Sequence, residues 1–74
     1  MNSELRSIVA DILDLDPSEV RDDLGPGRGD GWDSLSHLKI ISAVEETFDL
    51  RLSMDEIQGV DSFAALARIV AGRR

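Results

Sequence analysis

Each patterned segment of this chain has the apolar spacing of an α-helix, and no segment of useful length alternates as a half-buried β-strand does. The first segment has one apolar helix face, formed by Leu5, Ile8, Val9, Ile12 and Leu13. A second segment begins at Asp33–Ser34 and ends at Phe48. Its apolar residues, at steps of three or four, are Leu35, Leu38, Ile41 and Val44. The spacing therefore predicts two long amphipathic helices.

Two more helices follow in the sequence. Ser53 can cap a short helix that ends at Gly59, and Asp61 or Ser62 can cap a closing helix. The closing helix has the apolar stripe Phe63, Leu66, Ile69 and Val70. The pattern predicts an all-α fold, a small bundle of three main helices plus one short helix, in a single domain over residues 1–74.

The proline and glycine content of residues 15–32 predicts a long loop between the first and second helices. Pro17 stops the first helix, and a helix interior disfavours the glycines that follow, which are Gly25, Gly27, Gly29 and Gly31. The spacing of these glycines matches neither the dinucleotide-binding fingerprint nor the P-loop motif, and no predicted strand precedes them. We therefore interpret the glycine-rich stretch as a flexible loop. Asp14 and Asp16 lack the remaining residues of a calcium loop and are expected to cap turns. Val20 and Leu24 are expected to reach the core.

The composition restricts the choice of partner. Fifteen acids against eight bases give a formal charge of -7, which disfavours nucleic acid and anionic membranes and favours a basic protein surface. Cysteine is absent, so disulfides and thiolate metal sites are excluded. The N-terminal residues resemble neither a signal peptide nor a membrane span. We expect a cytoplasmic, monomeric protein.

Ser34 and His37 lie three residues apart on the second predicted helix, close enough to suggest an activated nucleophile. A hydrolase also needs an orienting group, an oxyanion hole and a pocket that excludes water, which a bundle of this size can hardly supply. We therefore predict no catalytic activity and interpret His37 as a polar residue on the helix surface. Ser34 itself is either a routine helix start beside the cap Asp33 or an exposed hydroxyl that accepts a phosphate-linked group at a helix N-terminus.

The string Gly31-Trp32-Asp33-Ser34-Leu35, followed by SHLKIISAVEETFDL, resembles the acyl carrier protein family, and the resemblance extends over the whole chain. In that family the serine of the Asp-Ser-Leu motif carries 4′-phosphopantetheine through a phosphodiester. The resemblance implies that Ser34 carries this arm, with Asp33 and Leu35 beside it. It also implies an acyl-carrier-like fold and three kinds of partner: a phosphopantetheinyl transferase, an acyl-loading enzyme and acyl-processing enzymes.

The same resemblance implies that the second helix is the main recognition surface, with partner-binding residues Leu38, Lys39, Ser42, Glu45 and Glu46, the two glutamates on its outer face. It further implies an interior shelter for an apolar chain, which Ile41, Val44, Ile57 and Phe63 could line. Fatty-acid carriers commonly have acids where this chain has Ser36 and Lys39, and a small residue in place of Trp32. These departures favour a carrier of polyketide-type or other specialised biosynthesis. The alternatives are a peptidyl or aminoacyl carrier and an arm-free acidic helical adaptor.

Overall fold

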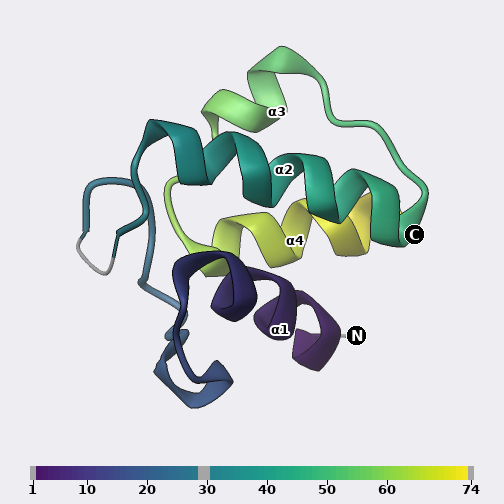
Figure 1. The fold of residues 1–74 in the computed structure, drawn as a ribbon. Helices are drawn as coiled ribbons and strands as arrows, with labels where there is room; N and C mark the ends of the chain where they lie inside the picture. Colours follow the sequence, from purple (N-terminus) through teal and green to yellow (C-terminus); the bar gives the residue numbers. More distant parts are fainter. Residues whose placement is uncertain (1, 29–30, 74) are drawn as a thin grey trace.

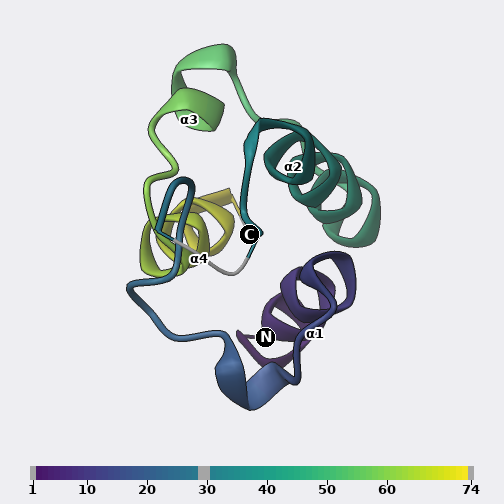
Figure 2. The same cartoon turned by 60° about the vertical axis from the view of Figure 1, so that its left-hand side comes forward.

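The computed structural model describes residues 2–28 and 31–73, and within these ranges the chain contains helices and no strand. The elements in chain order are α1 (Asn2–Leu13), the 3-10 helix η1 (Pro17–Glu19), α2 (Ser34–Phe48), α3 (Met54–Gln58) and α4 (Phe63–Arg73). This confirms the predicted all-α bundle of three main helices and one short helix. Figure 1 shows α2 lying over α4, with α1 on one side of this pair and α3 on the other. Figure 2 shows the same order from a second direction.

The core fills the space that α1, α2 and α4 surround. Its largest fully buried side chains are Trp32, Phe63, Leu5, Leu24, Ile40, Leu66, Val9, Val20, Val44 and Val70. Most of these were expected from the helical spacing, and Val20 and Leu24 reach the core from the loop as predicted. No polar or charged side chain is buried among the described residues, so the helices are held mainly by apolar contact.

Local sequence signals fix the helix ends. Asp33 accepts a hydrogen bond from the Ser36 amide at the start of α2, and Ser53 accepts one from the Glu56 amide at the start of α3. Ser62, one of the two predicted caps, accepts one from the Ala65 amide at the start of α4. Each bond satisfies an N–H group that has no partner within its own helix.

Two aspartates in the left-handed conformation mark the other ends. Asp14 follows α1 with φ 59°, and Asp49 follows α2 with φ 53°. In both places the next amide turns back to the helix: Leu15 donates to the Ala10 carbonyl at 2.8 Å and Leu50 to the Glu45 carbonyl at 3.0 Å. Aspartate tolerates this conformation better than most residues, and the turn-back bonds are those of a Schellman motif.

The predicted flexible loop between α1 and α2 is partly regular. Asp16 caps η1 by accepting from the Ser18 amide, and Glu19 accepts from the Asp16 amide in return, which completes a capping box. Arg6 of α1 donates to the Val20 carbonyl and pairs with Asp22 at 3.0 Å. The expectation that Asp16 caps a turn is confirmed.

The last helix also holds this loop in place. The Phe63 amide donates to the Leu24 carbonyl at 2.7 Å, and the Ala64 amide donates to the Asp22 carbonyl at 3.0 Å. The first turn of α4 therefore uses loop carbonyls as acceptors for N–H groups that have no partner in their own helix. Together these bonds position the chain that leads to α2.

Candidate functional site

Ser34 is the first residue of α2, and its side chain is exposed. Its neighbour Asp33 has extended backbone and caps the helix through the 2.8 Å bond from the Ser36 amide. The backbone N–H of Ser36, and after it the Ser36 hydroxyl, stabilises the carboxylate and lowers the pKa of Asp33. The hydroxyl of Ser34 is thus presented to solvent at the positive end of a fifteen-residue helix.

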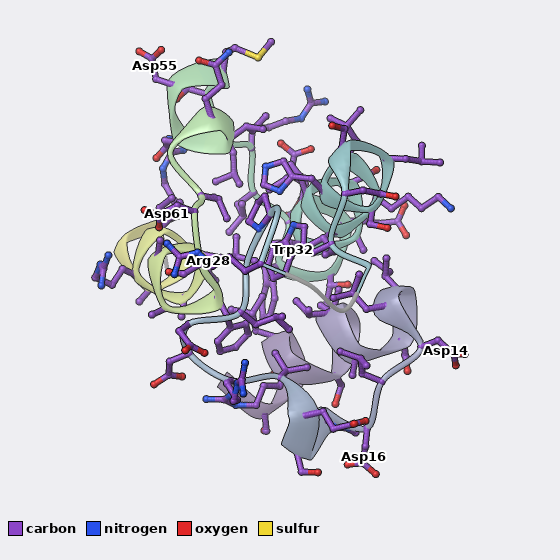
Figure 3. The ribbon with its side chains drawn as sticks, turned by 90° about the vertical axis from the view of Figure 1, so that its left-hand side faces the viewer. Asp14, Asp16, Arg28, Trp32, Asp55 and Asp61 are labelled. Atoms are coloured by element: carbon purple, nitrogen blue, oxygen red, sulfur yellow. The ribbon has the colours of Figure 1, made fainter. Side chains whose placement is uncertain are left out.

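Trp32, two residues before Ser34, is an anchor of the core. Only 2% of its surface is exposed, and Figure 3 shows its side chain in the space between α2 and α4. The sequence interpretation placed Trp32 in the loop as a departure from a small residue and missed this role. A lone tryptophan next to a glycine-rich stretch was the available signal, because so large an apolar surface is seldom left in water.

The glycines around Trp32 shape the turn into α2. Gly27 has φ 75° and Gly31 has φ 80°, a backbone region that glycine enters without steric cost. The Gly27 amide donates to the Trp32 carbonyl at 3.1 Å, and the Asp33 amide donates to the Gly31 carbonyl at 2.8 Å. These bonds fix the chain on both sides of the buried indole, and Gly29 of the glycine series lies outside the described residues.

An open cleft of about 770 Å³ lies beside Ser34. One wall comes from the loop and the first turns of α2, and the other from α3 and the residues after it. The lining residues are Pro26, Gly27, Gly31, Trp32, Asp33, Ser34, His37, Leu38, Met54, Ile57, Gln58 and Val60. Most of the lining side chains are apolar, and the polar ones are Asp33, Ser34, His37 and Gln58. This cleft can accept an elongated group that begins at Ser34 and has an apolar part.

The cleft does not coincide with the interior cavity that was predicted to hold an apolar chain. Ile41, Val44 and Phe63 are buried in the packed core, and Ile57 is the member of the predicted set that lines the cleft. The helical spacing correctly identified the buried residues, but it could not show that their side chains fill the interior.

The interpretation of His37 as a surface residue was wrong. Its ring is half-buried, and both nitrogens are bonded. The Trp32 Nε1–H donates to His37 Nδ1 at 3.0 Å, and His37 Nε2 lies 3.0 Å from the Ile57 carbonyl oxygen. The ring therefore connects the loop, α2 and α3. A ring held in this way is not available to activate Ser34, which agrees with the prediction that the two do not form a catalytic pair.

The predicted partner-binding residues share the exposed side of α2, with one exception. Leu38 is 60% exposed, and Lys39, Ser42 and Glu46 are also exposed. Leu35, which was expected beside the arm, is 62% exposed. Glu45 is half-buried, and its Oε2 accepts a hydrogen bond from the Leu52 amide at 2.9 Å. The expectation that Glu45 points outward like Glu46 was therefore wrong, since this carboxylate holds the chain that follows α2.

Among the described residues, no group of three or more histidine, cysteine, aspartate or glutamate side chains is arranged to hold a metal ion. No helix within residues 2–28 and 31–73 is long and apolar enough to cross a membrane. The fold and the site together define a small helical bundle with an exposed serine at the mouth of an apolar cleft.

Comparison with known proteins agrees with this description. The model of a family described as phosphopantetheine attachment site matches residues 3–70. Polyketide-8 synthase acyl carrier protein 2 of Streptomyces avermitilis is 33% identical over 70 residues, which are 95% of this chain and 80% of that protein. The chain belongs to the phosphopantetheine attachment site family and is a phosphopantetheine-bearing carrier protein. The family is non-catalytic, and its members depend on a phosphopantetheinyl transferase and on synthase enzymes as partners.

The residues around Ser34 fit a phosphopantetheine group. The exposed hydroxyl offers an attachment atom, and the helix N-terminus favours the phosphate that would be linked to it. The cleft that Ser34 lines is also lined by the apolar side chains of Leu38, Met54 and Val60. A flexible arm can lie there without displacing a buried side chain.

Proposed function

We propose that Ser34 is the residue that carries phosphopantetheine and that this chain is an acyl carrier protein of polyketide-type or other specialised biosynthesis. The observation that supports this most directly is the position of the Ser34 hydroxyl, exposed at the first residue of α2 and at the mouth of the cleft. When bound, phosphopantetheine supplies a flexible arm that ends in a thiol, on which acyl groups are held as thioesters.

In this proposal the chain presents its serine and leaves the chemistry to its partners. The Ser34 oxygen loses its proton and forms a phosphodiester with the phosphopantetheine of coenzyme A, and the nucleotide part of coenzyme A leaves. The transferase supplies the base and the magnesium ion, so Ser34 needs no activating neighbour. Asp33 fixes the first turn of α2, and Leu35 is exposed beside the attachment atom. A tethered acyl group has a high effective concentration at each partner enzyme.

The exposed face of α2 is proposed as the partner surface. Leu38, Lys39, Ser42 and Glu46 offer exposed side chains there, whereas the half-buried Glu45 is bound to the Leu52 amide. The charge of -7 favours partners with basic surfaces, and complementary charge accelerates encounter. The polyketide assignment is supported by the Streptomyces avermitilis relative and by Lys39 in the middle of this face. We infer a monomer that acts in the cytoplasm, where coenzyme A is made.

The attachment test uses mass spectrometry. The unmodified chain is incubated with coenzyme A, magnesium and a broad-specificity phosphopantetheinyl transferase, and its intact mass and fragments are measured. We expect the gain of one phosphopantetheine on Ser34 and no gain for Ser34→Ala. Ser7→Ala is the matched control, because Ser7 is an exposed serine on α1 and should not affect modification. Modification of Ser34→Ala at the normal rate would disprove the assignment of the site.

Two alternatives predict different results. An arm-free acidic adaptor would gain no mass under conditions that modify a known carrier. A peptidyl or aminoacyl carrier would accept the arm, but in the native host it would be loaded with amino acids. The intact mass of the protein purified from that host therefore separates these alternatives from an acyl carrier.

A further inference from the structure

The short helix α3 forms part of one wall of the cleft, yet it has little burial of its own. None of its five residues is buried, and Met54 at its start is 68% exposed. A helix of this length is not stable in isolation, so its position depends on contacts with other elements. The contacts that hold it therefore determine the shape of the cleft beside Ser34.

One set of contacts comes from the end of α4. Arg73 pairs with Glu56, with its Nε 3.2 Å from Oε2, and its Nη1 donates to the Arg51 carbonyl at 2.8 Å. Glu56 also accepts from the Ser53 amide at 2.8 Å, which completes a capping box at the start of α3. These bonds hold the first part of α3 and the chain before it, and they involve neither the loop nor the first turns of α2.

A polar contact from His37 holds the opposite end, where the Ile57 side chain also packs against the core. The Ile57 carbonyl lies in the last turn of α3, where it also accepts a longer hydrogen bond from the Val60 amide at 3.3 Å. His37 Nε2 lies 3.0 Å from this oxygen, although the two residues are twenty positions apart. Ile57 and the nearby Gln58 and Val60 line the cleft, so His37 holds the part of α3 that faces the interior of the site.

Trp32 determines which nitrogen of His37 can donate. An indole N–H can only donate, so the 3.0 Å contact makes His37 Nδ1 the acceptor. In neutral imidazole the other nitrogen then carries the hydrogen, and Nε2–H donates to the Ile57 carbonyl. The indole is fixed in the core with 2% exposure, so it also sets the orientation of the ring. The three groups form a directed chain of hydrogen bonds from core to α3.

We propose that His37 is a positioning residue, oriented by Trp32, that holds the C-terminal end of α3 against α2 and so fixes the wall of the cleft beside Ser34. This inference goes beyond the proposed function and does not require Ser34 to be modified. It assigns to the WDSLSH segment a second task, which is to support the cleft as well as to present the serine.

The first test is spectroscopic and uses the unmodified chain. The sequence contains one histidine and one tryptophan, so the side-chain ¹⁵N signals are assigned without ambiguity. At neutral pH we expect His37 to be the tautomer with hydrogen on Nε2, and the Trp32 indole N–H to exchange slowly with solvent. A tautomer with hydrogen on Nδ1, or equal populations of the two, would overturn the proposal.

The second test measures amide hydrogen exchange in variants. His37→Phe keeps a ring but removes both bonds, and we expect the Ile57, Gly59 and Val60 amides to exchange about tenfold faster. His37→Gln keeps one acceptor and one donor and should restore most of the protection. Lys39→Gln is the matched control on the exposed face of α2 and should leave these rates unchanged.

Core amides of residues 40–44 in α2 separate positioning from general stability. If His37 positions α3, these amides change by less than about twofold in His37→Phe while the α3 amides accelerate. The same acceleration in both groups would show that His37 only stabilises the whole fold. Unchanged α3 amides, or His37→Gln that behaves like His37→Phe, would also overturn the proposal. A failure of phosphopantetheine attachment would leave every one of these measurements interpretable.

Discussion

Gly25 lies directly against the backbone of Asp61, so that a Cβ atom at Gly25 would be 2.1 Å from the Asp61 carbonyl oxygen. The loop before the site and the segment between α3 and α4 therefore touch main chain to main chain. Neither backbone can move aside as a flexible side chain would. The contact lies close to the hydrogen bonds that the Phe63 and Ala64 amides donate to the loop, and together they hold the loop against the start of α4. Gly25 does not have a positive φ, so backbone conformation is not what requires glycine at this position. The requirement comes from the close approach of the two backbones, which leaves no room for a Cβ atom.

Gly25→Ala should lower the free energy of unfolding by about 1–3 kcal/mol, because the added methyl group forces two backbones apart. Gly72→Ala is the control, since a Cβ there meets nothing within 4 Å and the residue lies in α4, where alanine favours the helix. Urea unfolding of both variants measures the difference. Equal stability of Gly25→Ala and the unchanged chain would contradict the close contact.

Asp33 should make the stability of the fold depend on pH. Its pKa is lowered in the folded chain, so its contribution is complete above the unfolded value of about 3.9 and is lost as the pH falls through the lower folded value. Asp33→Asn keeps a good helix cap without a titrating group and should lose less stability between about pH 5 and pH 2. Urea unfolding at several pH values gives the slopes.

Asp33→Ala is the matched comparison, because it removes the cap as well and should be less stable than Asp33→Asn at neutral pH. Asp16 and Glu56 have lowered pKa values as well, chiefly because backbone N–H groups of Ser18 and Ser53 donate to them, so part of the pH dependence remains in both variants. Identical slopes for the unchanged chain and Asp33→Asn would refute the role of this carboxylate.

Lys39→Glu should change partner choice without changing the fold, because the Lys39 side chain is exposed on the proposed surface of α2. We expect faster association with fatty-acid-type partners that carry basic surfaces, and a steeper loss of binding with added salt. Arg68→Glu makes the same change of charge at an exposed position of α4 and should have a smaller effect. Unchanged or weaker binding of Lys39→Glu to such partners would remove this argument for a specialised pathway.

Leu35→Ala should separate docking from stability. Leu35 is 62% exposed, so its removal should alter the free energy of unfolding by no more than about 0.5 kcal/mol. If Leu35 contacts the transferase beside Ser34, modification at low carrier concentration should slow about fivefold to tenfold. Arg68→Ala is the control, because Arg68 is exposed on α4 and lies outside both the cleft and the proposed surface. Equal rates for the unchanged chain and Leu35→Ala would argue against that contact.

The helices and their caps could be predicted because the signals are local. Asp33 lies three residues before the amide that it binds, and Ser53 and Ser62 follow the same rule. The apolar residues of α1 and α4 repeat at helical steps, so their buried faces follow from geometry alone. Ser34 as a candidate needed the wider Asp-Ser-Leu context, since a serine at a helix start is common.

The features that were missed depend on residues far apart in the sequence. His37 reaches Ile57 twenty positions away, and Glu45 reaches Leu52 seven positions away across a turn. A polar residue on an amphipathic helix has the same pattern whether it meets water or another element, so spacing cannot distinguish these cases. The sequence predicted a flexible loop for a similar reason. The loop carbonyls accept hydrogen bonds from amides of α4, which begins at Phe63, and local sequence does not show such distant partners.

The use of loop carbonyls by α4 has a consequence for the order of events during synthesis. The acceptors belong to Asp22 and Leu24, while their donors are the amides of Phe63 and Ala64. In a growing polypeptide Ser34 is made before those donors. The loop at Asp22 and Leu24, which leads into the turn before the serine, gains these two bonds only after α4 has emerged. A transferase that recognises the finished turn would therefore act on folded chains and pass over nascent ones.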